Sequence, residues 1–165
     1  MAHESRLNEA LRQLVLSERT ATLGTLDHEG EVSLSRVPYA IDPQRGDLII
    51  HISALASHTA QLLRHPRASV LIGEREVEGA PVHALPRISI AVVTESCEAD
   101  TDSASSQAAR TCYLTRFPEA EPMTQLADFR FVRLQPLGAR HVAGFGAARS
   151  LSAQDLSQVL CHPAP

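Results

Sequence analysis

The stretch "TATLGTLDHEGEVSLSRVPYAI", residues 20–41, decides the fold class of this chain. β-branched and apolar residues run along both of its arms, and the tetrapeptide Asp-His-Glu-Gly at 27–30 lies between them. A four-residue turn of this composition is typical of the link between two antiparallel strands. The stretch therefore predicts a β-hairpin, which needs further strands beside it to form a stable sheet.

Four more stretches have the composition of strands. The first, "LIIHIS" at 48–53, is nearly all apolar and is expected to be buried on both faces. It is followed by 68–73, by 87–96 and by 128–144, where a Pro/Gly turn is expected to separate two strands. A doubly wound sheet would need a helix after nearly every strand, and this chain lacks that alternation. The pattern favours a mainly β (α+β) fold, an antiparallel barrel with peripheral helices.

Helical patterns flank these strands. Apolar residues recur at helical spacing in an opening helix at 4–17. Ser57 is expected to cap a short helix that His65 and the following proline end. A third helix is expected at 105–117, and a short helix and tail occupy 150–165.

Length and composition are those of an ordinary globular protein. A chain of 165 residues can bury one core, so a single domain over residues 1–165 is expected. No stretch approaches about 18 uninterrupted apolar residues, and the polar start lacks the features of a secretory signal. A cytoplasmic protein with no membrane partner is therefore expected. The net charge of -4 gives no electrostatic footprint for nucleic acid.

All 15 basic residues are arginines. A Schiff base on a lysine is therefore impossible, and a phosphate has to be held by Arg, Ser, Thr, His or backbone amides. The cysteines, Cys97, Cys112 and Cys161, are odd in number and widely spaced, which favours reduced thiols over a disulfide framework. The histidines show no HxxxH or HxH grouping, so no metal site is predicted.

Phosphate binding is the sharpest interpretation of Ser57, His58 and Thr59. These residues fall where the short helix is expected to begin, and unpaired amides and the helix dipole favour an anion there. The alternative is that Ser57 only caps the helix while the next two side chains face water. Arg36, among small polar neighbours in "SLSRVP", is suited to fork onto phosphate oxygens, and its alternative is a solvated surface arginine.

The order of these motifs resembles the FMN-binding split barrel of the pyridoxamine 5'-phosphate oxidase-like superfamily, over about residues 7–150. The resemblance implies a six-stranded antiparallel split β-barrel with peripheral helices, which forms a homodimer with a flavin at the subunit interface. The chain is most similar to the haem-utilisation (HugZ/HutZ-like) branch. The matching residues precede the short helix and follow the last strand: Ser53, Leu55, His58, Thr59, Gly144, Phe145 and Gly146.

The resemblance implies FMN as the cofactor. Arg36 and the Ser57-His58-Thr59 helix start would hold its phosphate, and Arg87 would reach the flavin or its phosphate near the dimer interface. The isoalloxazine ring would pass along residues of two strands, Val37, Pro38, Ile52 and Ser53. A deazaflavin also presents a phosphate and a flat ring, so the sequence leaves the two cofactors open.

Some residues depart from the pattern of the family. The chain has no lysine and no tryptophan. A true pyridoxamine phosphate oxidase is expected to have a lysine near the phosphate and a C-terminal Trp/Arg/His segment that binds the substrate. Vitamin B6 oxidation is therefore not expected. Gln61 stands where asparagine is usual, and Ala143-Gly144 stands where two glycines are usual. Both changes are compatible with flavin binding.

Haem is the alternative ligand. A neutral imidazole can ligate haem iron, and a carboxylate can orient that imidazole. The candidate ligands are His141, beside the "GFG" loop, and His162, near the C-terminus. The resemblance implies a haem-ligating histidine near the C-terminus, with Asp128 as its candidate carboxylate partner. The alternatives are a strand position for His141 and a plain tail residue for His162.

Three functions follow from these observations. The first is a homodimeric FMN-dependent oxidoreductase that acts on a small-molecule substrate, with its catalytic residues unassigned. The second is a haem-binding or haem-degrading protein on the same barrel. The third is a flavin-dependent sensor or carrier without enzymatic activity.

Overall fold

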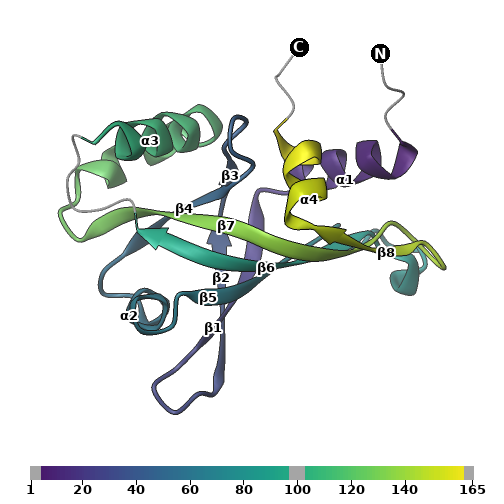
Figure 1. The fold of residues 1–165 in the computed structure, drawn as a ribbon, viewed down its shortest axis with the longest axis horizontal. Coiled ribbons are helices and arrows are strands. Elements are labelled where there is room, and N and C mark those ends of the chain that lie inside the picture. The colour runs from purple at the N-terminus through teal and green to yellow at the C-terminus, as the bar shows by residue number, and fades with distance from the viewer. Residues whose placement is uncertain (1–4, 97–102, 162–165) are drawn as a thin grey trace.

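A computed structural model describes residues 5–96 and 103–161, and its centre is one antiparallel sheet (Figure 1). The strand order is β2-β1-β5-β6-β7-β4-β3, and β8 pairs with β7 beside this path. The sheet curls into a half-barrel that encloses the main core. The strands are β1 Thr20–Leu26, β2 Val32–Pro38, β3 Ala40–Ile41, β4 Leu48–Ser53, β5 Arg67–Gly73, β6 Arg87–Ser96, β7 Phe129–Val142 and β8 Ala148–Ser152.

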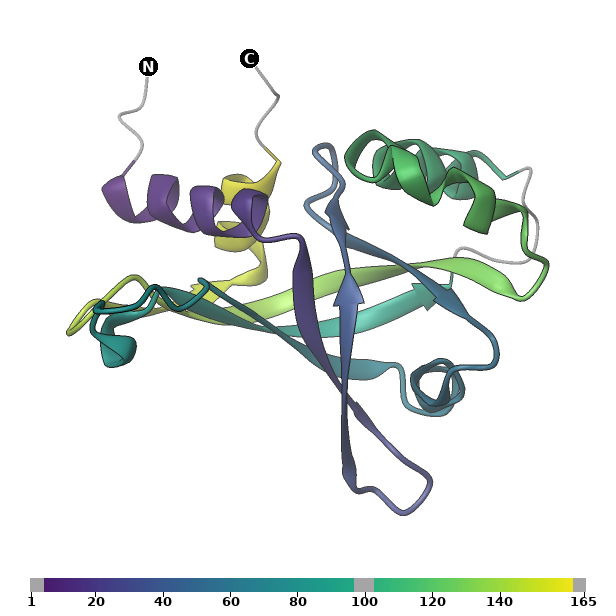
Figure 2. The same cartoon turned by 180° about the vertical axis from the view of Figure 1, so that it is seen from behind.

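Helices lie around the sheet in three places. α1 and α4 pack side by side at one end of the half-barrel, α3 covers β3 and β4, and α2 lies near β1 at the other end (Figures 1 and 2). The α-helices match the expected positions, and two 3₁₀ segments, η1 and η2, lie in the loops. The bounds are α1 Arg6–Ser17, α2 Ser57–Arg64, α3 Ala104–Arg116, α4 Ala153–Leu160, η1 Val82–Ala84 and η2 Pro118–Gln125.

The mainly antiparallel α+β fold is confirmed, but the count of six strands is wrong. The described residues form eight strands, because the chain adds the two-residue β3 and the short β8. The turn expected at Pro136 and Gly138 is also wrong, since β7 continues through both residues as one strand. Ala91 pairs with Gly138 and Val92 with Pro136, so Leu137 is the extra residue of a bulge next to the proline. Proline cannot donate to the ladder, and bulges are among the places in a sheet where it is tolerated.

The hairpin predicted from residues 20–41 is confirmed. β1 pairs with β2 from Thr20 opposite Pro38 to Leu26 opposite Val32. In the turn, Asp27 Oδ1 accepts hydrogen bonds from the amides of Glu29 and Glu31, which lower the pKa of the Asp27 carboxyl. Gly30 adopts φ +84°, a conformation that side chains disfavour, and this explains the glycine at that position.

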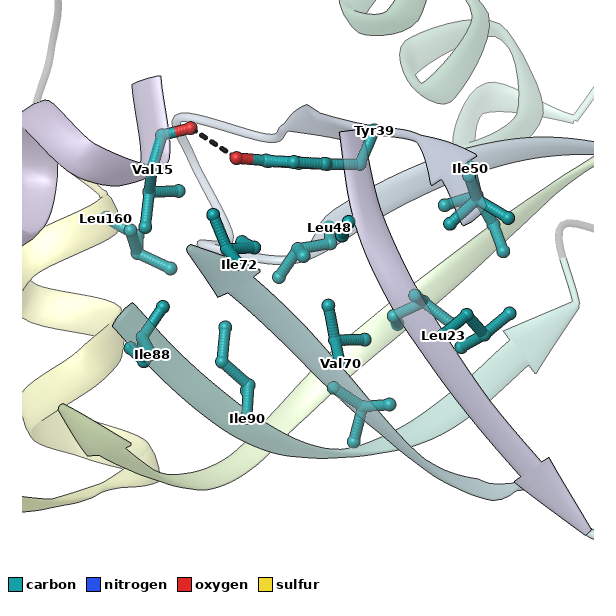
Figure 3. Close-up of a cluster of buried hydrophobic side chains, with 14 of the residues drawn as sticks. Val15, Leu23, Tyr39, Leu48, Ile50, Val70, Ile72, Ile88, Ile90 and Leu160 are labelled. Atoms are coloured by element: carbon teal, nitrogen blue, oxygen red, sulfur yellow. Dashed lines mark hydrogen bonds between the residues drawn. The ribbon is translucent and has the colours of Figure 1, made fainter. Parts of the chain in front are cut away.

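The main core fills the inside of the curled sheet (Figure 3). Alternate residues of the strands point inward, and α1 and α4 close one end with apolar side chains that include Leu11 and Leu160. Tyr39 is fully buried among them and donates its hydroxyl to the carbonyl of Val15 at 2.6 Å, so helix and sheet are joined by a satisfied polar contact. Burial raises the pKa of this phenol.

A second cluster lies between α3 and the outer side of β4 and β7. His51 stacks on Phe131 with ring centroids 4.4 Å apart, and burial lowers the pKa of His51 to about 4. Beside it the fully buried Arg133 donates to Asp42 at 2.7 Å. β4 is therefore buried on both faces, as its apolar sequence predicts.

No helix in the described parts of the chain is long and apolar enough to cross a membrane.

Replacing Leu11 tests whether α1 holds the half-barrel closed. Leu11→Ala is expected to lower the free energy of unfolding by about 2–5 kcal/mol, because it removes a fully buried side chain and leaves a cavity. Leu7→Ala on the same helix is the matched control, expected to cost about 0.5 kcal/mol or less since Leu7 is 40% exposed. Urea unfolding followed by circular dichroism measures both, and equal losses would contradict the packing described for α1.

Candidate functional site

The two faces of β2 separate the residues that sequence reasoning grouped together. Val37 lies in the core and Ser35 is half-buried on the same inner side, whereas Arg36 and Pro38 point outward. Side chains alternate along a strand, so neighbours such as Ser35 and Arg36 necessarily lie on opposite faces. Arg36 Nε donates to the hydroxyl of Thr20 on the neighbouring β1 at 3.0 Å.

The turn from β4 into α2 is fixed by short hydrogen bonds. The Thr59 hydroxyl donates to the carbonyl of Ser53 at 2.6 Å, and the Ser53 hydroxyl donates to Asp128 Oδ2 at 2.6 Å. The Ser53 hydroxyl also accepts from the amide of Leu55 at 3.0 Å, and the amide of Ala54 donates to the carbonyl of Asp128. Ser53 therefore joins the start of α2 to the start of β7.

Ser57 does not cap α2, contrary to the sequence prediction. Ala56 is the N-cap, and no side chain accepts from the first-turn amides. The turn around Ser53 moves the cap back by one residue, because Ala56 takes the extended conformation and its carbonyl accepts from the amide of Thr59. Ser57 is thus the first helical residue, and its exposed hydroxyl forms no hydrogen bond within the described residues.

His58 faces the inner side of the hairpin. Its Nδ1 shares a hydrogen bond with the Ser35 hydroxyl at 3.1 Å, and its buried Nε2 has no partner among the described residues. Burial lowers the pKa of His58, so the imidazole is neutral near pH 7 and offers a phosphate no charge. One turn further, the Thr25 hydroxyl donates to Gln61 Oε1 at 2.6 Å. A polar layer therefore docks α2 onto the inner side of the hairpin, away from Arg36.

The remaining predicted flavin residues fall into two groups. Val37 and Ile52 are almost completely buried in the main core, so a ring could pass only along the backbone there. Arg87 is exposed at the start of β6, where its Nη1 donates to the carbonyl of Leu85 at 3.1 Å. Within one subunit the structure brings together Ser53, Thr59 and Asp128, but it does not bring Arg36 to His58.

The candidate haem residues are placed differently from one another. His141 is 1% exposed, and its Nδ1 accepts from Arg149 Nε at 3.3 Å. Burial, followed by the charge of Arg149, lowers the pKa of His141, so this imidazole is neutral but is not presented to an external ligand. Asp128 is half-buried and held by Ser53. His162 lies outside the described residues.

Sequence reasoning missed one feature of the outer face of the sheet. Arg140 on β7 is exposed there, diagonally across from Arg87 on β6, because Ser89 pairs with Arg140 and Arg87 pairs with Val142. The one feature of the sequence that could have pointed to Arg140 is its place at an alternating position of a predicted strand. The register that makes the two arginines neighbours depends on the bulge in β7, which the sequence pattern hides.

An apolar cleft lies under α2 in the described part of the chain, and it is lined by Ile52, Thr59, Leu62, Leu63, Thr94, Arg130 and Val132. Its cavity volume is about 30 Å³, far below the roughly 300–1,000 Å³ that is usual for a pocket that encloses a cofactor. Among the residues described here, no cluster of His, Cys, Asp and Glu could hold a metal ion.

Comparison with known proteins identifies relatives of this sequence and fold. Residues 7–143 match the family described as pyridoxamine 5'-phosphate oxidase. The haem oxygenase HutZ of Vibrio cholerae is 30% identical over 154 residues, covering 93% of this chain and 85% of that protein. The non-canonical haem oxygenase HOZ of the Arabidopsis thaliana chloroplast is also 30% identical, covering 89% of this chain and 45% of that protein.

Solved structures agree with these matches. A haem-binding protein from Mycobacterium smegmatis superposes with a TM-score of 0.81 at 28% identity, covering 95% of this chain and 62% of that chain. The crystal structure of HutZ, there described as a haem storage protein, gives a TM-score of 0.72 at 27% identity over 80% of this chain and 91% of that one. The similarity to the haem-utilisation branch is thereby confirmed in sequence and in fold.

Two alanine substitutions distinguish the observed helix start from the predicted one. Ser53→Ala is expected to lower the free energy of unfolding by about 1–3 kcal/mol, because it leaves the Asp128 carboxylate without its donor. Ser57→Ala is expected to change it by no more than about 0.5 kcal/mol. Chemical unfolding measures both. A capping Ser57 would give the reverse order, since removal of a cap costs about 0.5–2 kcal/mol.

Proposed function

We propose that this chain, which belongs to the pyridoxamine 5'-phosphate oxidase family, binds haem and takes part in its degradation. The single observation that carries the proposal is the similarity to HutZ over 93% of the chain. The plant haem oxygenase and the mycobacterial haem-binding protein support the same ligand. Degradation would consume dioxygen, which the haem iron would activate, and electrons from an external donor.

The described residues fit haem in part. Haem is planar and largely apolar and carries two carboxylates, so it needs an apolar surface, cationic side chains and an axial ligand. Exposed apolar residues and arginines share the outer face of the sheet, among them Leu34, Leu71 and Arg87. The two most buried imidazoles of the described chain, His51 and His141, are closed off from an external iron. The family resemblance implies a haem-ligating histidine near the C-terminus, and we assign the axial position to His162 on that ground.

Asp128 is the residue that would orient this ligand. Its Oδ2 already accepts from Ser53, and a carboxylate accepts more than one hydrogen bond, so the group can also accept from an imidazole N–H. Such a hydrogen bond fixes the tautomer and the direction of a ligating histidine. Asp128 would act by positioning His162, without contact to the iron.

A homodimer with the ligand at the subunit boundary is the expected assembly. The described cleft is smaller than the pockets that usually enclose cofactors, and the outer face exposes apolar residues such as Val32, Leu34 and Leu71. A second copy would supply the missing wall, and closed two-fold symmetry is the commonest arrangement for soluble oligomers.

FMN binding, with oxidoreductase activity, is the second candidate function. The observation in its favour is Arg36, an exposed arginine whose guanidinium contacts only the neutral hydroxyl of Thr20 among the described residues. Such a group is free to form charge-assisted hydrogen bonds with a phosphate. Because Arg36 and the first turn of α2 lie on different sides of the hairpin, a shared phosphate site would have to involve a second subunit.

A haem titration tests the first candidate. The protein is expected to give a Soret band, and His162→Ala is expected to weaken haem binding and shift the band by removing the axial ligand. Asp128→Asn is expected to lower the affinity about 10- to 100-fold by releasing that ligand. His28→Ala, in the exposed hairpin turn, is the control. An unchanged spectrum in both variants, or loss of the band in His141→Ala alone, would remove the assignment. Turnover of bound haem with dioxygen and a reductant separates degradation from storage.

An FMN titration tests the second candidate. Arg36→Ala is expected to weaken FMN binding about 10- to 100-fold, the equivalent of one charge-assisted hydrogen bond of about 1.5–3 kcal/mol. Riboflavin, which lacks the phosphate, serves as the control ligand and is expected to bind parent and variant equally. Flavin fluorescence and light scattering would measure affinity and dimer formation. A protein that takes up neither FMN nor a deazaflavin would leave haem as the ligand.

A further inference from the structure

We infer that the outer face of β5, β6 and β7 is the wall on which the tetrapyrrole lies, and that Arg87 and Arg140 bind its two carboxylates. This inference rests on the proposed function, since it specifies where the ligand lies and which side chains bind its carboxylates. Asp128 and Arg140 lie at opposite ends of β7, about 40 Å apart along the strand, so in the proposed homodimer one subunit would supply the axial ligand with Asp128 and the other would supply the two arginines. No sequence motif assigned Arg140, and the register of the sheet supplies the reason to choose it.

The two arginines form a diagonal pair. Ser89 lies opposite Arg140 and Arg87 lies opposite Val142, so the two arginines occupy the outer face at positions that are typically about 7–8 Å apart. Arg140 Nη1 donates to the Ser150 hydroxyl at 3.2 Å, and Arg87 Nη1 donates to the Leu85 carbonyl at 3.1 Å. Neither forms an ion pair with a described residue. Both side chains carry a positive charge on the same face, and a ligand with two carboxylates could form charge-assisted hydrogen bonds with both.

The charge of the surrounding face is one-sided. The formal net charge of the whole chain is -4. The part of the outer face that α3 leaves uncovered nevertheless carries several arginines and, among the described residues, a single acid. This face consists of the outward positions of β1, β2, β5, β6, β7 and β8. That acid, Glu95, already pairs with Arg45 at 3.0 Å. The arginines on this face are Arg36, Arg67, Arg87 and Arg140. The face is therefore complementary to an anionic ligand.

The part of the outer face beside Arg87 and Arg140, here called the floor, carries mostly small side chains. Moving across the sheet from Arg140, the same row passes Ser89 on β6, Leu71 on β5 and Thr22 on β1. The next row contains small residues on four successive strands: Gly24, Ser69, Ala91 and Gly138. Small side chains allow a planar ring to approach the sheet, and Leu71, which is 45% exposed, offers it an apolar contact.

The test compares haem with haem dimethyl ester, which keeps the ring and iron but lacks the carboxylate charges. Arg87→Gln and Arg140→Gln are each expected to weaken haem binding at least about ten-fold, the loss of one charge-assisted contact. The affinity of each variant for the ester is expected to stay within about two-fold of that of the parent protein, because the floor and the axial ligand are unchanged. Absorbance titration of the full-length protein measures both ligands, and Arg140→Lys is expected to recover part of the affinity.

Arg6→Gln is the matched control. Arg6 is exposed at the first residue of α1, and this helix packs against the core on the inner side of the sheet, away from the outer face. The control is therefore expected to change haem affinity less than two-fold. Unfolding midpoints of all variants, measured by circular dichroism, are expected to match that of the parent protein, since the three side chains are exposed.

The outcomes separate the two ideas. Haem binding that survives Arg87→Gln and Arg140→Gln unchanged would overturn the inference and leave haem binding in place. Equal weakening of haem and its ester would also overturn it, because the arginines would then act without contacting the carboxylates. Dissociation of a dimer at unchanged haem affinity would assign this face to a second copy and would likewise overturn it. Absence of haem binding by the parent protein would overturn the proposed function itself.

Discussion

The alternation of side chains along the strands of a curled sheet is the constraint on which this molecule depends. Inward positions of β1, β5, β6 and β7 carry Leu23, Val70, Ile90 and Leu134, all of them almost completely buried. Because the inside is filled by its own side chains, the interior of the half-barrel has no room for a cofactor. A ligand of the proposed kind would therefore have to bind on the outer face or at the ends of the strands.

The same alternation divides the polar residues of the hairpin between two tasks. Ser35 and Thr25 point inward and dock α2 through His58 and Gln61. Arg36 points outward and contacts only a neutral hydroxyl. His58 and Arg36, which the sequence analysis assigned to one phosphate site, therefore lie on opposite sides of the hairpin. The neutral state of His58, a result of burial, fits a structural role in this layer.

Because the chain has no lysine, the placement of its arginines bears on whether haem or flavin suits it better. Each anionic group of a ligand has to meet an arginine, a hydroxyl, a histidine or an amide. Arg36 stands alone at one edge of the outer face, whereas Arg87 and Arg140 form a pair near the other. A single phosphate suits the first arrangement, and two neighbouring carboxylates suit the second. The second arrangement belongs to the haem proposal, which rests on the similarity to the haem oxygenase HutZ.

The sequence by itself determined the hairpin, the buried β4, the helices and the antiparallel α+β class, because hydrophobic period and turn residues act over a few positions. The family resemblance also followed from local motifs around Ser53 and His58. Only the tertiary structure decided that Ser57 is not the cap, that Pro136 lies within a bulged strand, and that Arg140 is a neighbour of Arg87. These features depend on strand register and on contacts between distant segments, which no local pattern encodes.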